Sequence, residues 1–245
     1  HEKILNVLES VKILKCPVLT DEKNYPEADI GILTGSVRTE HDRHAAVEMR
    51  KKCRTLIAFG TCAVYGGLHG AGLAHSREEI MDHVYRNSPS TRTDFIPGNS
   101  ISGLEKMVTP IDEVIEVDLY LPGCPPHPHF IFEGLSALIE NRSPRSGQES
   151  VCAGCRRTMV KTEVTAIKEI TEEVPDNAIC FLSQGYICQG SVTLDRCLTP
   201  CPNHGMPCSG CAGPTMQILT EPTRDIRTEI GDRMARLTKI PYDTV

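Results

Sequence analysis

Cysteine is the residue type in this chain with the clearest capacity for chemistry, because its thiolate is both a nucleophile and a metal ligand. The 245 residues include 12 cysteines, and eight of these fall in the last hundred residues. Eight thiols divide into two sets of four, the number that holds either a tetrahedral zinc ion or a cubane iron–sulfur cluster. The eight are Cys152, Cys155, Cys180, Cys188, Cys197, Cys201, Cys208 and Cys211.

The residues between these cysteines favour iron–sulfur clusters over zinc. Glycines let the backbone approach a ligand closely and turn its N–H groups inward, and the sulfides of a cluster accept such hydrogen bonds. Two structural zinc sites are the alternative that the spacing leaves open. Disulfides fit less well, since nothing else in the composition is typical of a small secreted scaffold. The glycines are Gly185, Gly190, Gly205, Gly210 and Gly213.

Two further cysteines follow predicted strands in the first half of the chain. Thr55–Gly60 is a buried apolar strand that runs directly into Cys62, and Glu116–Leu121 is another that ends in the turn carrying Cys124. The carboxyl ends of parallel strands meet at one edge of a sheet, where ligands bind. The two thiols therefore predict half of a third cluster site, although as isolated residues they would be buried apolar thiols.

The elements that must position these cysteines alternate between strand and helix up to residue 142. This alternation predicts an α/β fold with a doubly wound parallel sheet. The polar segment 141–147 is the predicted boundary, so that residues 1–145 form the α/β domain and residues 146–245 a loop-rich, cysteine-ligated domain. The remaining regular elements of the first domain are a strand at Ile30–Val37 and helices at Glu40–Lys52 and His129–Ile139.

Several other segments carry weaker patterns. The sequence predicts a helix at His1–Ser10, a strand at Val11–Leu19, loops with short helices over 68–110, a helix at Thr162–Glu173 and an amphipathic helix at Arg224–Lys239. The apolar face of the last helix is expected to pack against the α/β domain.

Composition limits the possible functions. The net charge of −6 argues against a nucleic-acid partner, which would require a clustered basic surface. No run of about 18 apolar residues is present, so no membrane span is expected. The sequence begins at His1 inside a helical pattern and without a methionine, from which we expect that residues precede it.

The turns Gly-Thr-Cys62-Ala and Leu-Pro-Gly-Cys124-Pro-Pro, together with the cysteine-rich tail, resemble the small subunit of a [NiFe] hydrogenase over essentially the whole chain. The resemblance implies a flavodoxin-like first domain and a proximal [4Fe–4S] cluster with Cys62 and Cys124 among its ligands. In that family the other two ligands come from a C-x-x-C motif, which would lie directly before His1. An upstream extension of roughly 10 to 30 residues, enough for one strand and a turn, is therefore expected.

In the tail, the resemblance assigns two more clusters. A histidine stands at the position of Cys152 in membrane-bound uptake hydrogenases, and a proline at the position of Cys201, which leaves their medial cluster as [3Fe–4S]. Cysteine at both positions implies [4Fe–4S] clusters, three in all, and a lower potential for the medial one. The distal set is Cys152, Cys155, Cys180 and Cys188, and the medial set is Cys197, Cys201, Cys208 and Cys211.

This pattern resembles the cytoplasmic group 3 hydrogenases, and the F420-non-reducing, heterodisulfide-reductase-linked type in particular. The F420-reducing and NAD(P)-linked types are the alternatives. The resemblance implies an electron-relay subunit with no catalytic residues of its own, a [NiFe] large subunit as partner, and a flavin or iron–sulfur subunit as electron acceptor. From spacing alone, the fourth ligands of the two tail clusters can be exchanged, as happens in two-cluster ferredoxins.

Two other classes of protein share part of this pattern. The related cluster subunit of respiratory complex I has the two cysteine turns, but it has one cluster and so leaves the tail unexplained. A zinc-stabilised interaction protein would lack the absorption of an iron–sulfur protein.

A few residues have open roles. Cys16 and Cys53 match no ligand position and are expected to be structural thiols, the first on a strand and the second at a helix end. His127 and His129 are interpreted either as hydrogen-bond donors to a cluster or as partly exposed helix-start residues. Glu2 either passes protons at a subunit interface or is a solvated carboxylate.

Overall fold

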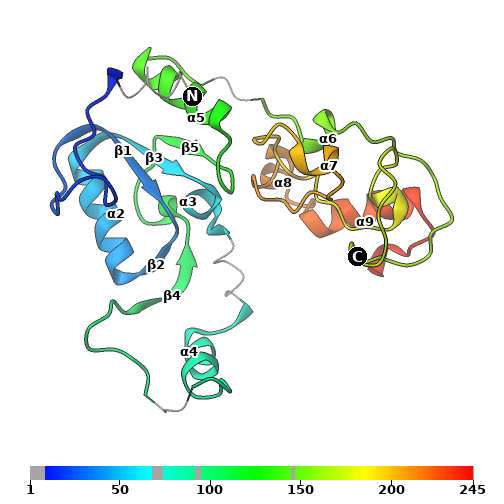
Figure 1. The fold of residues 1–245 in the computed structure, drawn as a ribbon, viewed down its shortest axis with the longest axis horizontal. Coiled ribbons are helices and arrows are strands. Elements are labelled where there is room, and N and C mark those ends of the chain that lie inside the picture. The colour runs from blue at the N-terminus through cyan, green and yellow to red at the C-terminus, as the bar shows by residue number, and fades with distance from the viewer. Residues whose placement is uncertain (1–8, 68–73, 92–94, 145–146, 245) are drawn as a thin grey trace. The chain divides into compact units, whose positions relative to one another are not determined.

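The structure is a computed structural model that describes residues 9–67, 74–91, 95–144 and 147–244. The chain divides into two compact units (Figure 1). The first consists of His1–Pro125 and Ile131–Arg142, and the second of Pro126–Phe130 and Ser143–Val245.

A parallel sheet forms the centre of the first unit. Its strands are β1 (Ala28–Thr34), β3 (Cys53–Phe59) and β5 (Leu119–Leu121), in the order β1-β3-β5. Ile57 of β3 lies opposite Ile32 of β1 on one side and Leu119 of β5 on the other. The predicted α/β fold with a parallel sheet is therefore confirmed.

Helices cover both faces of this sheet. A Cβ atom on Gly31 would stand only 3.1 Å from the sulfur of Met49, so this face packs closely on α2 (Glu40–Lys52). A Cβ atom on Gly134 of α5 (Pro128–Ile139) would stand 3.0 Å from Leu121. Gly31 and Leu121 align with Leu56 and Phe59 of β3, which point to opposite faces of the pleated strand.

Helix α2 has the predicted bounds, Glu40–Lys52, because its start is well specified. The Thr39 hydroxyl accepts a hydrogen bond from the Asp42 N–H at 3.2 Å, and the Asp42 carboxylate accepts one from the Thr39 N–H at 2.8 Å. This reciprocal capping satisfies two amides that have no partner within the helix.

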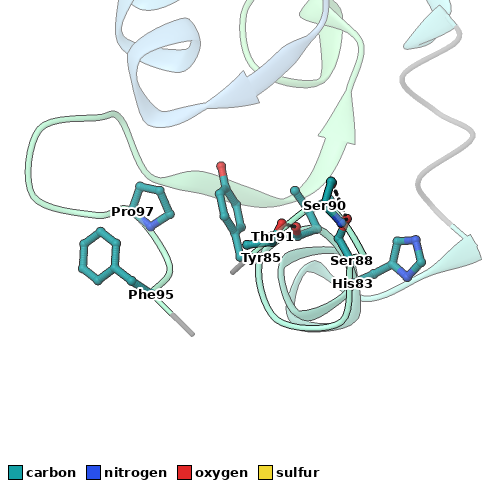
Figure 2. A pocket seen from close by; sticks show the side chains of 8 residues that line it. His83, Tyr85, Ser88, Ser90, Thr91, Phe95 and Pro97 are labelled. Carbon is teal, nitrogen blue, oxygen red and sulfur yellow. Dashed lines mark hydrogen bonds between the residues drawn. The ribbon is translucent and has the colours of Figure 1, made fainter. Parts of the chain in front are cut away.

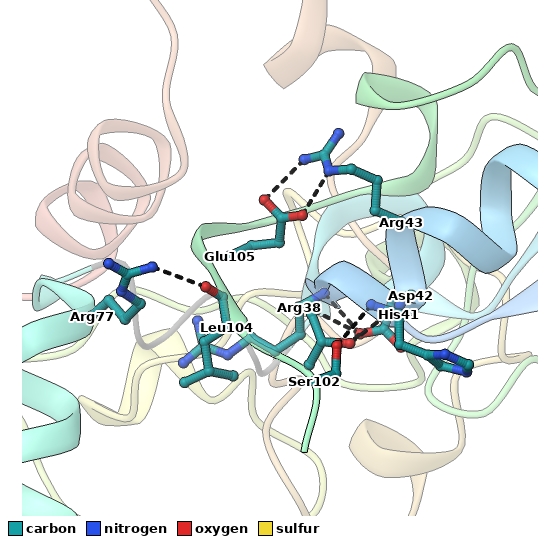
Figure 3. A network of polar contacts seen from close by, with 9 residues as sticks. Arg38, His41, Asp42, Arg43, Arg77, Ser102, Leu104 and Glu105 are labelled. Atoms are coloured by element: carbon teal, nitrogen blue, oxygen red, sulfur yellow. Dashed lines mark hydrogen bonds and ion pairs between the residues drawn. The ribbon is translucent and has the colours of Figure 1, made fainter. Parts of the chain in front are cut away.

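A two-stranded antiparallel ribbon, β2 (Val37–Thr39) with β4 (Leu104–Thr109), extends from the first unit. Figure 3 shows how polar contacts attach it: the Arg43 guanidinium donates to Glu105 at 2.6 Å, and Arg77 donates to the Leu104 carbonyl at 3.1 Å. Arg77 begins α4 (Arg77–Tyr85), one of the short helices predicted for this segment, whereas the sequence pattern had assigned β4 to a loop.

The prediction of a strand at Val11–Leu19 is wrong. The segment turns at Cys16, whose carbonyl accepts hydrogen bonds from the N–H groups of Leu19 and Thr20, and Val18 and Leu19 are exposed. Of the helix predicted at 1–10, the described residues Glu9 and Ser10 are helical, and 1–8 lie outside the described residues.

The second unit is built around its own apolar core, with short helices and long loops. The largest buried side chains are Tyr186, Phe181, Met234 and Ile240. The elements are α6 (Val151–Gly154), η3 (Leu182–Gln184), α7 (Pro200–Asn203), α8 (Met216–Thr220), α9 (Ile226–Leu237) and η4 (Tyr242–Thr244).

Helix α9 forms near the end of the chain, as the sequence predicts. The prediction that its apolar face packs against the α/β domain is wrong. Ile230 and Met234 of α9 are buried in the core of the second unit itself, beside Phe181 and Tyr186. No helix among the described residues is long and apolar enough to cross a membrane.

The helix predicted at Thr162–Glu173 does not form. The backbone N–H groups of Thr162 and Lys168 donate instead to the carbonyls of Leu237 and Gly185, which lie far away in sequence. Val164, Ile167 and Ile170 still pack on the core. The apolar spacing therefore identified the buried side chains but not the backbone conformation.

Candidate iron–sulfur sites

Cys62 and Cys124 lie in two turns that the parallel strands β3 and β5 bring together. Cys62 is in the short helix α3 (Thr61–Tyr65), just beyond Gly60, and Cys124 follows Gly123. The Gly60 N–H donates to the Leu121 carbonyl at 2.8 Å, and the Thr61 N–H donates to the Gly123 carbonyl at 2.9 Å. The Thr61 hydroxyl also accepts from the Gly123 N–H at 3.0 Å. These hydrogen bonds join the turns directly beside the two cysteines.

The surroundings of Cys62 leave no room for a side chain on the neighbouring loop. Gly67 has φ +58°, and a Cβ atom there would stand 2.5 Å from the Cys62 sulfur. Cys62 is half-buried and Cys124 is exposed. The edge of the sheet therefore presents two thiols on close-packed backbone, the arrangement predicted for half of a cluster site.

In the second unit, Cys155, Cys180 and Cys188 lie near enough to Cys152 to influence its ionisation. Cys152 lies in the single turn of α6 and Cys155 caps its end, and the Cys152 N–H donates to the Gly190 carbonyl at 3.3 Å. Cys180 is attached near this turn through its N–H bond to the Thr158 carbonyl at 2.8 Å. Ionisation of Cys188, Cys180 or Cys155 would raise the pKa of the Cys152 thiol.

The second tail set gathers around α7. Cys201 lies in this helix and Cys197 precedes it, while Cys208 is buried and Cys211 is half-buried. The charges of Cys211 and Cys208 act on the Cys197 thiol, and that of Cys201 acts on Cys208. These interactions occur between thiols of the same predicted set, and the assignment of four ligands to each cluster stays a prediction.

The two groups meet at Cys188 and Cys208. The Cys208 N–H donates to the Cys188 sulfur at 3.3 Å, and the Gln189 N–H donates to the Cys208 carbonyl at 2.9 Å. A Cβ atom on Gly190 would stand 3.4 Å from the Cys152 sulfur and 3.6 Å from the Cys188 sulfur. Close backbone and inward N–H groups are what the sulfurs of an iron–sulfur cluster require, so the residues present fit that group.

Burial opposes ionisation of these thiols. It raises the pKa of Cys152 to about 12 and the pKa values of Cys188 and Cys197 to about 11. Hydrogen bonds from the backbone act in the other direction, lowering the pKa of Cys188 through Cys208 and Gly190 and that of Cys197 through Thr199. Donors are therefore already aimed at the sulfurs that would become thiolates.

The residues with open roles lie as follows. Cys53 is the first residue of β3 and is buried in the core of the first unit, where desolvation raises its pKa. Cys16 lies in the turn described above and not on a strand. His127 and His129 lie at the start of α5, and both rings meet Phe130 edge-on. Glu2 lies outside the described residues.

Two residues of the second tail group were not predicted from the sequence. Asp195 precedes Cys197 and Thr199 follows it, and the two residues are joined by two hydrogen bonds. In the sequence, each of these residues lies two positions from Cys197. Many polar residues lie as close to a cysteine, so this spacing alone does not identify Asp195 and Thr199.

A pocket elsewhere in the described chain does not coincide with the predicted cluster sites. The pocket in Figure 2, about 640 Å³ in volume, is lined by α4 and the segment after it, including His83, Tyr85 and Phe95, and contains none of the predicted ligands. Within the described ranges, the tail cysteines included, no group of three or more histidine, cysteine or acidic side chains is arranged to hold a metal ion.

Comparison with known sequences defines the class of protein. Residues 1–138 match the family described as the 20 kDa subunit of NADH ubiquinone oxidoreductase. The match covers more than half of the chain and includes both cysteine turns, but it stops before the first cysteine of the tail.

Relatives that match the tail as well narrow the class. The chain is 38% identical over 220 residues to a subunit of the F420-non-reducing hydrogenase vhu of Methanocaldococcus jannaschii, covering 89% of this chain and 76% of the relative. It is 35% identical to an iron–sulfur subunit of the F420-non-reducing hydrogenase of Archaeoglobus profundus, covering 91% and 77%. The chain therefore belongs to this family of hydrogenase small subunits.

Solved structures agree with this assignment. A chain of the NAD+-reducing [NiFe]-hydrogenase in its H2-reduced state is 31% identical, with a TM-score of 0.57 over 60% of this chain and 83% of that one. The actinobacterial-type NiFe-hydrogenase of Ralstonia eutropha, at 17% identity and a TM-score of 0.52 over 86% of this chain and 69% of that one, shares the fold. The hydrogenase relatives span the tail, which a complex I subunit would leave unexplained.

Proposed function

We propose that this chain is the electron-transfer subunit of a [NiFe] hydrogenase. It passes electrons from H2 oxidation in a large subunit to a downstream flavin or iron–sulfur partner. The observation that carries this proposal is that the tail thiols interact with one another over close-packed backbone, from Cys152 through Cys188 and Cys208 to Cys197. Bound [4Fe–4S] clusters supply one-electron carriers there.

The chain's own residues hold and separate these carriers. We assign Cys152, Cys155, Cys180 and Cys188 to a distal cluster and Cys197, Cys201, Cys208 and Cys211 to a medial one. Cys62 and Cys124 contribute two thiolates to a proximal cluster at the edge of the sheet, where the large subunit docks. In this proposal the first domain (1–145) carries the proximal site and the second (146–245) carries the other two.

The relatives support the choice of subgroup. Subunits named F420-non-reducing hydrogenase match this chain at 34–38% identity over about nine-tenths of its length. We therefore favour an acceptor of that enzyme type over F420 or NAD(P). A cytoplasmic location is part of the proposal, as the resemblance to the cytoplasmic group 3 hydrogenases implies.

Metal content and H2-dependent bleaching test the proposal. Purified without oxygen together with its large subunit, the chain should contain about twelve iron atoms if three [4Fe–4S] clusters are bound, and absorb at roughly 400 nm. Exposure to H2 should bleach this absorption. Stoichiometric zinc without iron would instead establish the zinc-stabilised class of protein.

Matched cysteine variants test whether the iron content and the absorption depend on the assigned thiols. Cys180→Ser should remove iron or alter its spectrum, because Cys180 lies with the Cys152–Cys155 turn. Cys16→Ser removes a half-buried thiol in the first unit and should leave the iron content unchanged. Equal effects of the two substitutions would contradict the ligand assignment.

A further inference from the structure

Thr199 has an unusual backbone conformation between two cysteines of the second tail group. It is only 1% exposed and has φ +53°, and Leu198 before it has φ +63°. Left-handed backbone is a genuine outlier for a β-branched residue and is sterically strained. Such a conformation persists where the surrounding contacts determine it, so the contacts of Thr199 matter.

Asp195 supplies those contacts. One carboxylate oxygen accepts a hydrogen bond from the Thr199 N–H at 3.1 Å, and the other accepts one from the Thr199 hydroxyl at 3.0 Å. The first oxygen also accepts from the Cys197 thiol at 3.7 Å. Asp195 is anchored in turn, because its own N–H donates to the Glu149 carbonyl at 2.9 Å.

Thr199 also contacts the turn that carries the other group of thiols. Its hydroxyl lies 3.2 Å from the Val151 carbonyl, so its single hydrogen lies between that oxygen and Asp195. A Cβ atom on Gly154 would stand 2.5 Å from the same hydroxyl oxygen. Glycine at 154 is therefore required for the Cys152–Cys155 turn to approach Thr199 this closely.

We propose that Asp195 and Thr199 are a positioning pair that fixes the Cys197–Cys201 loop against the Cys152–Cys155 turn and so sets the position of the Cys197 thiol beside Asp195. The inference rests on the proposed function, because it takes these thiols as cluster ligands. Outer-shell hydrogen bonds orient metal ligands, and donors to a ligand sulfur favour the more negative, reduced state of a cluster.

The test uses Thr199→Val and Thr199→Ser in the full chain with its clusters bound. Valine keeps the shape and the branched Cβ but removes the hydroxyl, so the loop loses one of the two contacts that hold Thr199 on Asp195. The reduction potential of the cluster held by Cys197 and Cys201, measured by EPR redox titration, should shift from its value in the unaltered chain. Iron from that cluster should pass to a chelator about tenfold faster, the lower end of outer-shell effects on metal binding. Thr199→Ser keeps the hydroxyl, so its reduction potential and its rate of iron release should match those of the unaltered chain.

Thr238→Val is the matched control. Thr238 is also buried in the second unit, and its hydroxyl donates to the Met234 carbonyl at 2.8 Å and accepts from the Ile240 N–H at 3.1 Å. This substitution should leave the reduction potentials of both tail clusters and the rate of iron release unchanged. Equal changes in Thr199→Val and Thr238→Val, or no change in Thr199→Val, would overturn the inference. Absence of iron–sulfur clusters from the unaltered chain would overturn the proposed function instead.

Discussion

At the scale of single residues, the thiols of the second unit are hard to ionise without metal. With a pKa of about 11 or 12, Cys152, Cys188 and Cys197 are neutral at pH 7. Metal binding must displace their protons, so cluster loading releases protons and is favoured as the pH rises. The backbone donors near these sulfurs reduce that cost.

Replacing Cys201 tests the assignment of the medial cluster at this scale. Cys201 lies in the first turn of α7, where the amide has no carbonyl acceptor within the helix, so proline is compatible with the backbone. Cys201→Pro should remove one thiolate and convert the medial cluster to [3Fe–4S], which EPR detects in the oxidised protein. Cys53→Ala, which alters a thiol outside both sets, should give no such signal. An unchanged spectrum in Cys201→Pro would show that Cys201 is not a ligand.

At the scale of elements, the alignment of β5 with β3 positions the proximal thiols. Asp118 sets this register where β5 approaches β3: its N–H donates to the Leu56 carbonyl at 3.0 Å, and its carboxylate accepts from the Leu56 N–H at 2.7 Å. The same carboxylate binds Arg50 at the end of α2 at 2.6 Å. A slip by one residue would turn Leu121 away from α5 and move Cys124 relative to Cys62.

Asp118→Asn should weaken this region in a pH-dependent way. The Leu56 N–H and then Arg50 lower the pKa of Asp118, so its contribution is complete above its ordinary pKa of about 3.9 and is lost as the pH falls through the lowered value. At pH 7 we expect a loss of about 1 kcal/mol, because the carboxylate is 40% exposed and screened by water. Hydrogen exchange of the β3 amides in urea measures the loss.

A neighbouring aspartate provides the comparison for this prediction. Asp29 of β1 pairs with Arg54 on the surface, and the two side chains are 83% and 81% exposed. Asp29→Asn should leave exchange in β3 unchanged at every pH. If Asp118→Asn behaves in the same way, or if its effect grows as the pH falls towards about 4, near the ordinary pKa of an aspartate, the role given to Asp118 is wrong.

At the scale of the whole molecule, the proposed function needs a partner on the first unit. Electrons from a large subunit would enter at the edge of the sheet where Cys62 and Cys124 lie, so this edge should be buried in the complex. We expect an interface well above about 2,000 Å², as in obligate assemblies. Hydrogen exchange should slow in residues 60–67 and 121–127 when the large subunit binds. Helix α9 belongs to the core of the second unit and serves as the internal reference. Unaltered exchange in both turns would contradict this docking face.

Some features of this protein could be read from the sequence because they depend on local chemistry. Thr39 and Asp42 specify the start of α2 through reciprocal hydrogen bonds, and the apolar runs before Cys62 and Cys124 specify strands that end beside them. The number and types of possible ligands are likewise properties of the sequence. These features were enough to predict the α/β fold, whereas the class of protein was predicted from the resemblance of the two cysteine turns and the tail to a known family.

Tertiary structure decided the rest, because it alone determines where backbone and side chains find their partners. Val164, Ile167 and Ile170 have helical spacing, but the backbone around them forms hydrogen bonds to distant loops. The spacing therefore predicted which side chains are buried, but not the backbone conformation. The spacing of eight cysteines allowed several groupings, and the fold adds what spacing cannot show, the contact of the Cys208 N–H with the Cys188 sulfur between the two predicted sets. The left-handed backbone of Thr199 is likewise invisible in sequence, since it is held by Asp195 and by close approach to Gly154.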